Sequence, residues 1–80
     1  MSTETPVPLI FLRPGMRAVI VDLNAGPGLR RRLLQLGFIP GEFIEVTHNF
    51  GLTVVVRLGS GATIALSKGV AQKIYVRVLP

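Results

Sequence analysis

The segment Gly26–Glu42, GPGLRRRLLQLGFIPGE, decides how the rest of the chain must be arranged. Its centre predicts a short helix over residues 28–36, because Leu29, Leu33 and Leu36 recur at helical spacing and form one apolar stripe. A helix with a single apolar stripe is stable only when that stripe is covered. We therefore expect these leucines to hold the helix on the core of the domain.

The end of this helix is marked by a run of turn-forming residues. Gly37 stands where a glycine in the left-handed conformation closes a helix, and Phe38 is placed to make the accompanying apolar contact. Pro40 and Gly41 then suit the two central positions of a type II turn. The turn leads into a strand whose first aromatic residue is Phe43. We expect both Phe38 and Phe43 to lie in the core.

Outside this segment, short runs rich in β-branched residues alternate with turn signals every 8–12 residues. This spacing favours a small barrel or sandwich. In the first run we expect Ala18 and Ile20 to share one face, with Asp22 as its third member. Residues 48–51 and 59–61 are predicted to be loops, the second a tight hairpin. The predicted strands are about five, over residues 17–23, 42–46, 52–58, 62–67 and 73–79, with one helical turn at 68–72 capped by Ser67.

Length and composition limit the chain to one basic domain. Eighty residues enclose a single core, and the chain has no cysteine and a formal net charge of +5. Residues 1–8 (MSTETPVP) predict a tail, and residues 9–80 the domain. PLIFL (8–12) is far too short to span a bilayer, which needs about 20 apolar residues. We therefore expect no membrane insertion. The net charge makes nucleic acid, acidic protein surfaces and anionic lipid the candidate classes of partner.

The ionisable residues argue against catalysis and against a metal site. The chain has one histidine and four carboxylates. An acid–base pair needs two titratable groups in one cleft, and a tight metal site needs three or four converging ligands. The available groups are Asp22, Glu42, Glu45 and His48, and ordinary solvated side chains are favoured over a weak metal site at Glu45 and His48. We expect no catalytic residue, no metal and no cofactor.

The most pointed feature is the arginine run of the helix. Consecutive helical residues are 100° apart, so Arg30, Arg31 and Arg32 spread over about 200° of the helix circumference. These arginines form either an ordinary solvated face or a docking patch for an acidic partner. Nucleic-acid binding is the third interpretation, and it normally adds exposed aromatic side chains. Phe50, in the predicted 48–51 loop, is the one aromatic residue placed for docking or stacking.

Three blocks resemble the FeoA ferrous-iron transport accessory proteins. They are LRPGMRAVIV (12–21), GLRRRLLQLGFIPG (28–41) and IALSKGVAQKIYV (64–76), and the resemblance extends over about residues 9–78. It implies an SH3-like barrel and a cytoplasmic protein that works beside FeoB, the GTPase-containing permease for Fe²⁺. The same domain also occurs at the C-terminus of iron- and manganese-responsive repressors.

Together these observations predict a non-enzymatic accessory protein of Fe²⁺ uptake that docks on or regulates the permease. The predicted contacts are Arg30, Arg31, Arg32 and Phe50. Family members are often described as binding transition-metal ions, but the resemblance carries over the partner and not a ligand set. The alternatives are a basic barrel that binds nucleic acid and a metal-sensing module. With 49% apolar residues, self-association also stays open.

Overall fold

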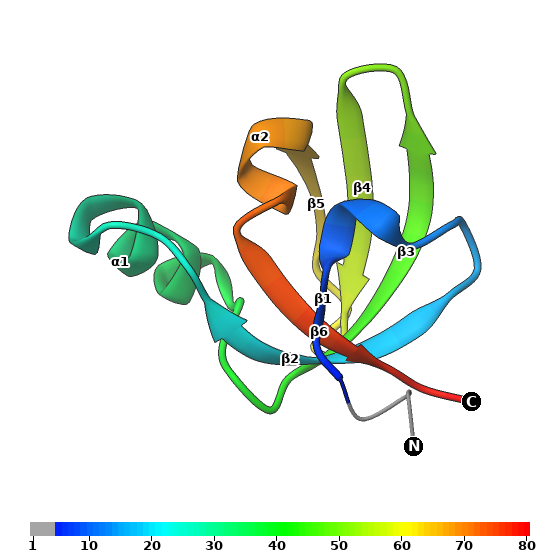
Figure 1. Ribbon diagram of the computed structural model, residues 1–80, viewed down its shortest axis with the longest axis horizontal. Helices are drawn as coiled ribbons and strands as arrows, with labels where there is room; N and C mark the ends of the chain where they lie inside the picture. Colours follow the sequence, from blue (N-terminus) through cyan, green and yellow to red (C-terminus); the bar gives the residue numbers. More distant parts are fainter. Residues whose placement is uncertain (1–4) are drawn as a thin grey trace.

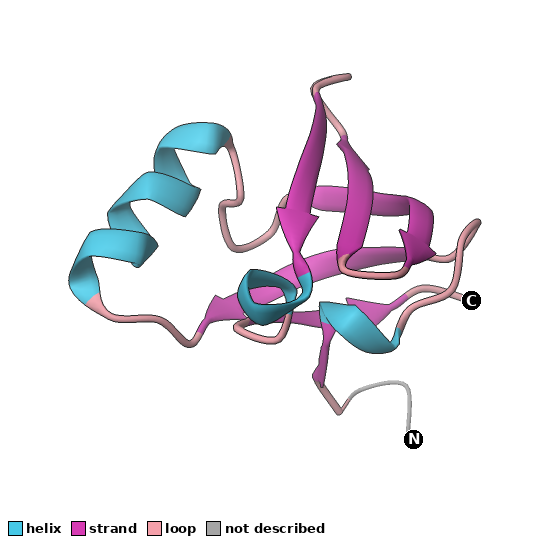
Figure 2. Cartoon of the chain, turned by 90° about the horizontal axis from the view of Figure 1, so that it is seen from above, coloured by secondary structure: helices cyan, strands magenta, loops and turns pink. Residues whose placement is uncertain are grey.

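The computed structural model describes residues 5–80, which form one antiparallel sheet that curves around a core, with helices at its margins (Figures 1 and 2). The six strands lie in the order β1-β6-β2-β3-β4-β5. In chain order the elements are β1 (Val7–Pro8), the 3-10 helix η2 (Leu9–Phe11), β2 (Arg17–Leu23), α1 (Pro27–Leu36), β3 (Phe43–Phe50), β4 (Thr53–Leu58), β5 (Thr63–Ser67), α2 (Lys68–Ala71) and β6 (Ile74–Val78).

The core is entirely apolar and lies inside the curve of the sheet. Burial alternates along the strands, as in β4, where Val54 and Val56 point inward and their neighbours are more exposed. Within residues 5–80 no polar or charged residue is buried. A core of aliphatic side chains with one phenylalanine, Phe38, suits so small a domain, because no polar or charged residue has to be fully removed from water. The predicted mainly-β barrel is confirmed.

A bulge in β2 changes which side chains reach the core. Ala18 and Ile20 are buried as expected, but the pairing of β2 with β6 shifts register between Ile20 and Asp22. One extra residue on β2 reverses the alternation of side chains. Leu23 therefore points inward and Asp22 is exposed. The prediction that Asp22 shares a face with Ala18 and Ile20 is wrong, and the bulge is the reason.

The sheet begins earlier than the sequence suggested. Val7 and Pro8, assigned to a tail, form β1 and pair with Val76 and Tyr75 of β6; residues 1–4 of that tail lie outside the described residues. β1 is an edge strand, where a proline costs no ladder hydrogen bond on its free side. The sheet therefore has six strands where about five were expected.

The β3–β4 hairpin is longer than predicted. The strand expected to end at residue 46 continues to Phe50, because a register shift between Val46 and His48 absorbs one residue and lets pairing resume. The predicted 48–51 loop is thus wrong, and the turn is the pair Gly51-Leu52. Gly51 has a φ of 64°, which suits the first central position of a type II′ hairpin turn.

Candidate docking surface

Helix α1 projects from the barrel between β2 and β3 (Figure 1). It begins one residue before the predicted start, with Gly26 as N-cap and Pro27 in the first turn. Proline suits this position because the first helical N–H groups have no partner within the helix. The Gly26-Pro27 pair was the available signal for this start.

The far end of α1 is closed by a Schellman motif. Gly37 has a φ of 107°, its N–H donates to the Leu34 carbonyl (3.1 Å), and the Phe38 N–H donates to the Leu33 carbonyl (2.9 Å). Phe38 then enters the core, where it is fully buried. A Cβ on Gly37 would also lie 3.0 Å from Cδ1 of Leu58. The positive φ requires glycine here, and an added Cβ would also crowd the Leu58 side chain.

The following turn ties the helix back to the sheet. Gly41 has a φ of 96°, and the Glu42 N–H donates to the Ile39 carbonyl (2.8 Å), which closes the turn around Pro40. The Gly41 N–H donates to the Ile20 carbonyl of β2 (2.7 Å), and the Ile20 N–H donates to the Glu42 carbonyl (2.9 Å). Main-chain hydrogen bonds to β2 therefore hold the exit of α1, in addition to the burial of Phe38.

The leucine stripe of α1 only partly contacts the core. Leu33 is buried and Leu29 packs partly buried against the core, but Leu36 is 45% exposed. Leu33 is the one buried residue in α1, so the helix is attached along a narrow line and leaves an apolar flank uncovered. The expectation that Leu36 holds the helix on the barrel is wrong.

The prediction that Phe43 lies in the core is also wrong. Phe43 is 37% exposed, because Ile44 takes the inward position at the start of β3.

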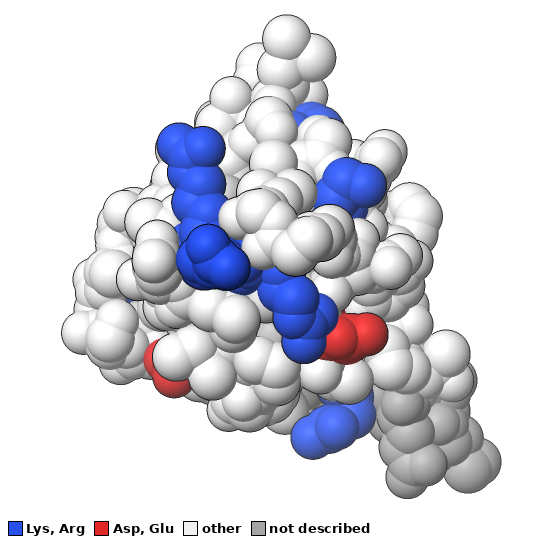
Figure 3. All heavy atoms as spheres, turned by 90° about the vertical axis from the view of Figure 1, so that its left-hand side faces the viewer, with Lys and Arg blue, Asp and Glu red and all other residues white. Residues whose placement is uncertain are grey.

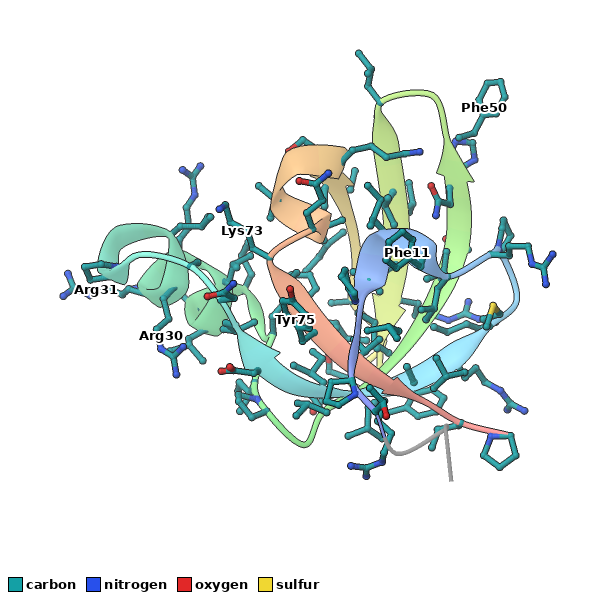
Figure 4. All side chains as sticks on the ribbon, in the orientation of Figure 1. Phe11, Arg30, Arg31, Phe50, Lys73 and Tyr75 are labelled. Carbon is teal, nitrogen blue, oxygen red and sulfur yellow. The ribbon has the colours of Figure 1, made fainter. Side chains whose placement is uncertain are left out.

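The three arginines differ in what they contact. Arg30 Nη1 donates to the Leu23 carbonyl at 2.7 Å and lies 3.8 Å from Asp22 Oδ1, so this side chain fastens the start of α1 to β2. Arg31 and Arg32 make no hydrogen bond or ion pair with any of residues 5–80. Figure 4 shows Arg31 pointing away from the barrel, and Figure 3 shows Lys and Arg side chains gathered across this face.

Phe50 lies far from the arginines. It is 76% exposed beside the β3–β4 turn, at the opposite end of the molecule from α1 (Figure 4). Its ring makes an edge contact with His48, with centroids 6.0 Å apart. Leu52, in the turn itself, is 84% exposed, and sequence analysis missed it because the turn was placed earlier. The structure therefore does not unite the predicted contacts into one surface.

A groove runs between α1 and the β5–α2 corner. It has a volume of about 280 Å³, and Arg32 is the one charged lining residue within the described part of the chain. Its lining is otherwise mainly apolar: Leu29, Leu33 and Leu36 from α1, Ala65, Leu66 and Ser67 from β5, and Val70 from α2. The sequence could not reveal this groove, because about thirty residues separate its two walls.

A second hollow lies beside β2 and β6. It measures about 300 Å³ and is lined by Pro6, Val21, Asp22, Asn24 and Tyr75. The Asp22 carboxylate in this hollow accepts the Leu23 N–H (2.8 Å) and faces Arg30. Across residues 5–80 there is no group of three or more His, Cys, Asp or Glu side chains that could hold a metal ion. In the same range, no helix has the length and apolar character needed to cross a membrane.

The fold and its helical insertion define a class of small SH3-like domains. A manganese-dependent transcriptional repressor contains a similar domain, with a TM-score of 0.84 and 26% identity over 94% of this chain and 44% of that one. The crystal structure of an iron uptake regulatory protein (FeoA) matches with a TM-score of 0.86 and 30% identity over 94% of this chain and 100% of that one. The predicted SH3-like fold is confirmed.

Sequence comparison narrows this class to one family. The FeoA domain model matches residues 7–78. A Methanocaldococcus jannaschii protein, provisionally named Fe(2+) transport protein A, is 32% identical over 69 residues, 86% of this chain and 83% of that protein. A Campylobacter jejuni protein of the same provisional name is 36% identical over 58 residues, 70% of this chain and 78% of that protein. The chain belongs to the FeoA family, whose role is in Fe²⁺ transport, as the sequence predicted.

Proposed function

We propose that the chain is a non-enzymatic accessory protein of Fe²⁺ uptake that docks through α1 on the cytoplasmic side of a FeoB-type permease. The family membership and the transport names of its relatives support the process. The observation that carries the docking role is that Arg31 and Arg32, which form no ion pair within residues 5–80, lie on the same helix as an apolar groove.

The distribution of charge supports an acidic partner at this surface. α1 has three arginines and no carboxylate, and Asp22, beside the start of the helix, is already engaged by Arg30. Complementary charge steers association and sets orientation, while an apolar groove supplies area that is removed from water on binding. The second ion pair within residues 5–80, Arg57 with Glu45 (3.1 Å), lies in the β3–β4 ladder and not on α1.

Charge reversal on the helix tests this proposal. The double variant Arg31→Glu with Arg32→Glu should bind the full-length, detergent-solubilised permease of the same organism at least about tenfold more weakly, because two attractive contacts become repulsive. The matched control is Arg13→Glu with Arg77→Glu, two exposed arginines outside α1 that change the net charge by the same amount. We expect the control to stay within about threefold of wild type.

The readout is a dissociation constant measured by titration at two salt concentrations. Wild-type binding should weaken at higher salt. If this salt dependence is lost in the α1 variant and kept in the control, docking through the helix is supported. Equal affinity of the wild type and the α1 variant contradicts it. Tight RNA binding with a steep salt dependence, and none to the permease, would instead favour a nucleic-acid-binding barrel.

A further inference from the structure

The groove has an open strand edge as one of its walls. β5 ends the sheet in the order β1-β6-β2-β3-β4-β5, and among the strands of residues 5–80 it pairs with β4 alone. Ala65, Leu66 and Ser67, three consecutive residues, all line the groove. Successive side chains of a strand point to opposite faces, so a hollow lined by three in a row follows the edge of the strand and not one of its faces.

The ladder shows which main-chain groups this edge presents. The Leu58 N–H donates to the Ala62 carbonyl (2.9 Å) and the Lys68 N–H donates to the Leu52 carbonyl (3.1 Å), with no register shift between these two points. Bonded and non-bonded pairs alternate in an antiparallel ladder. Thr63, Ala65 and Ser67 therefore direct their N–H and C=O groups away from β4. Ala65 is the central one of these residues.

The opposite wall and the rim specify the chemistry of an occupant. The α1 wall is formed by Leu29, Leu33 and Leu36, and Arg32 is at the groove with no ion-pair partner in residues 5–80. Among residues 5–80, no carboxylate lines the groove. An extended peptide with apolar side chains at alternate positions and carboxylates beside them matches the apolar wall, the charge and the open main-chain groups together.

We propose that the groove binds such an acidic, apolar segment of the partner as a seventh strand on the free edge of β5. Its backbone pairs with Ala65, its apolar side chains lie against the leucines of α1, and a carboxylate faces Arg32. This inference rests on the proposed function, since it takes the permease as the protein that carries the segment. A second copy of this chain fits less well, because its own arginine helix would enter the same interface.

The outward N–H of Ala65 provides a selective test. Ala65→Pro removes that donor, while the β4 ladder is kept because this N–H does not face β4, and edge positions of this kind tolerate proline. Ala65→Ser is the matched control, since it keeps the N–H and adds one small polar atom. Ala65→Pro should weaken binding to the full-length permease at least about tenfold, and Ala65→Ser should stay within about twofold.

Hydrogen exchange of the wild-type chain tests the same claim without a substitution. In the complex, the amides of Ala65 and Ser67 should exchange at least about tenfold more slowly than in the free chain, because a new strand would hold them. This measurement decides the question even if Ala65→Pro fails to fold. The exchange of Ile64 and Leu66, which bond to β4, should change less.

The outcomes separate this inference from the proposed function. If Arg31→Glu with Arg32→Glu weakens binding, but Ala65 gains no protection and Ala65→Pro binds normally, docking stands and strand addition is overturned. If the wild-type chain does not bind the permease, both are overturned. Concentration-dependent dimerisation that Ala65→Pro abolishes would assign the edge to a second copy, which also overturns the inference.

Discussion

The α1 end and the β3–β4 hairpin tip both offer exposed side chains, yet they are different kinds of surface. At the tip, Phe50 and Leu52 are 76% and 84% exposed on a protruding turn (Figure 4). At α1, leucines line a groove, with Arg31 and Arg32 on the same helix and an open strand edge opposite. Isolated exposed apolar residues are normal on protein surfaces, so exposure alone does not define a site. The combination of concavity, charge and open main-chain groups favours the α1 end.

The attachment of α1 should give the largest effect on stability. Leu33→Ala should lower the free energy of unfolding by about 2–5 kcal/mol, because Leu33 is the buried anchor of the helix and its removal leaves a cavity. Leu36→Ala is the control on the same stripe. It should cost no more than about 1 kcal/mol, because much of that side chain is already in water.

Chemical denaturation of both variants measures this difference. Equal losses for Leu33→Ala and Leu36→Ala would mean that the stripe is covered along its length, and that the groove between α1 and β5 is closed in solution.

Two glycines at opposite ends of α1 should show the next largest effect, with opposite signs. Gly37→Ala should destabilise by about 1–2 kcal/mol, because alanine is strained at a φ of 107° and its Cβ would approach Leu58. Gly28→Ala, within α1 and with nothing within 4 Å of an added Cβ, should stabilise by about 0.5–1 kcal/mol. Thermal unfolding in which both substitutions act in the same direction would contradict the Schellman ending.

The hairpin tip should respond least. Phe50 stays a predicted partner contact, but it is separate from α1. Phe50→Ser should weaken permease binding by no more than about threefold, because contacts away from the few residues that dominate binding energy contribute little. Its free energy of unfolding should change by no more than about 0.5 kcal/mol, because the ring is largely exposed. If Phe50→Ser weakens permease binding more than the α1 charge reversal does, the hairpin tip and not α1 is the main docking surface.

Local patterns predicted much of the fold. The helix, its glycine ending at Gly37 and the turn at Pro40 and Gly41 depend on residues only a few positions apart. The structure places the ending and the turn where the pattern indicated, and begins the helix one residue earlier. The Ser67 cap of α2 is likewise local, since its Oγ accepts the Val70 N–H at 3.2 Å. Helix caps and turns depend on residues within short segments, so the sequence alone could predict them.

What sequence analysis missed depends on pairing between distant segments. The bulge that turns Leu23 inward and Asp22 outward exists only against β6, and the extension of β3 to Phe50 only against β4. Asn49 shows the same limit, because its Nδ2 donates to the carbonyls of Ile10 (2.9 Å) and Leu12 (2.7 Å), nearly forty residues away. Arg30, grouped with its neighbours by sequence, is separated from them by its bond to Leu23.

The most direct test of the α1 end against the hairpin tip is an amide chemical-shift titration of the ¹⁵N-labelled chain with the full-length permease in detergent. The account predicts that shifts and line broadening concentrate in residues 29–36 and 63–67, around the groove, while Gly51 and Leu52 change little. Perturbations confined to the hairpin tip, with α1 and β5 unaffected, would contradict the assignment of the docking surface.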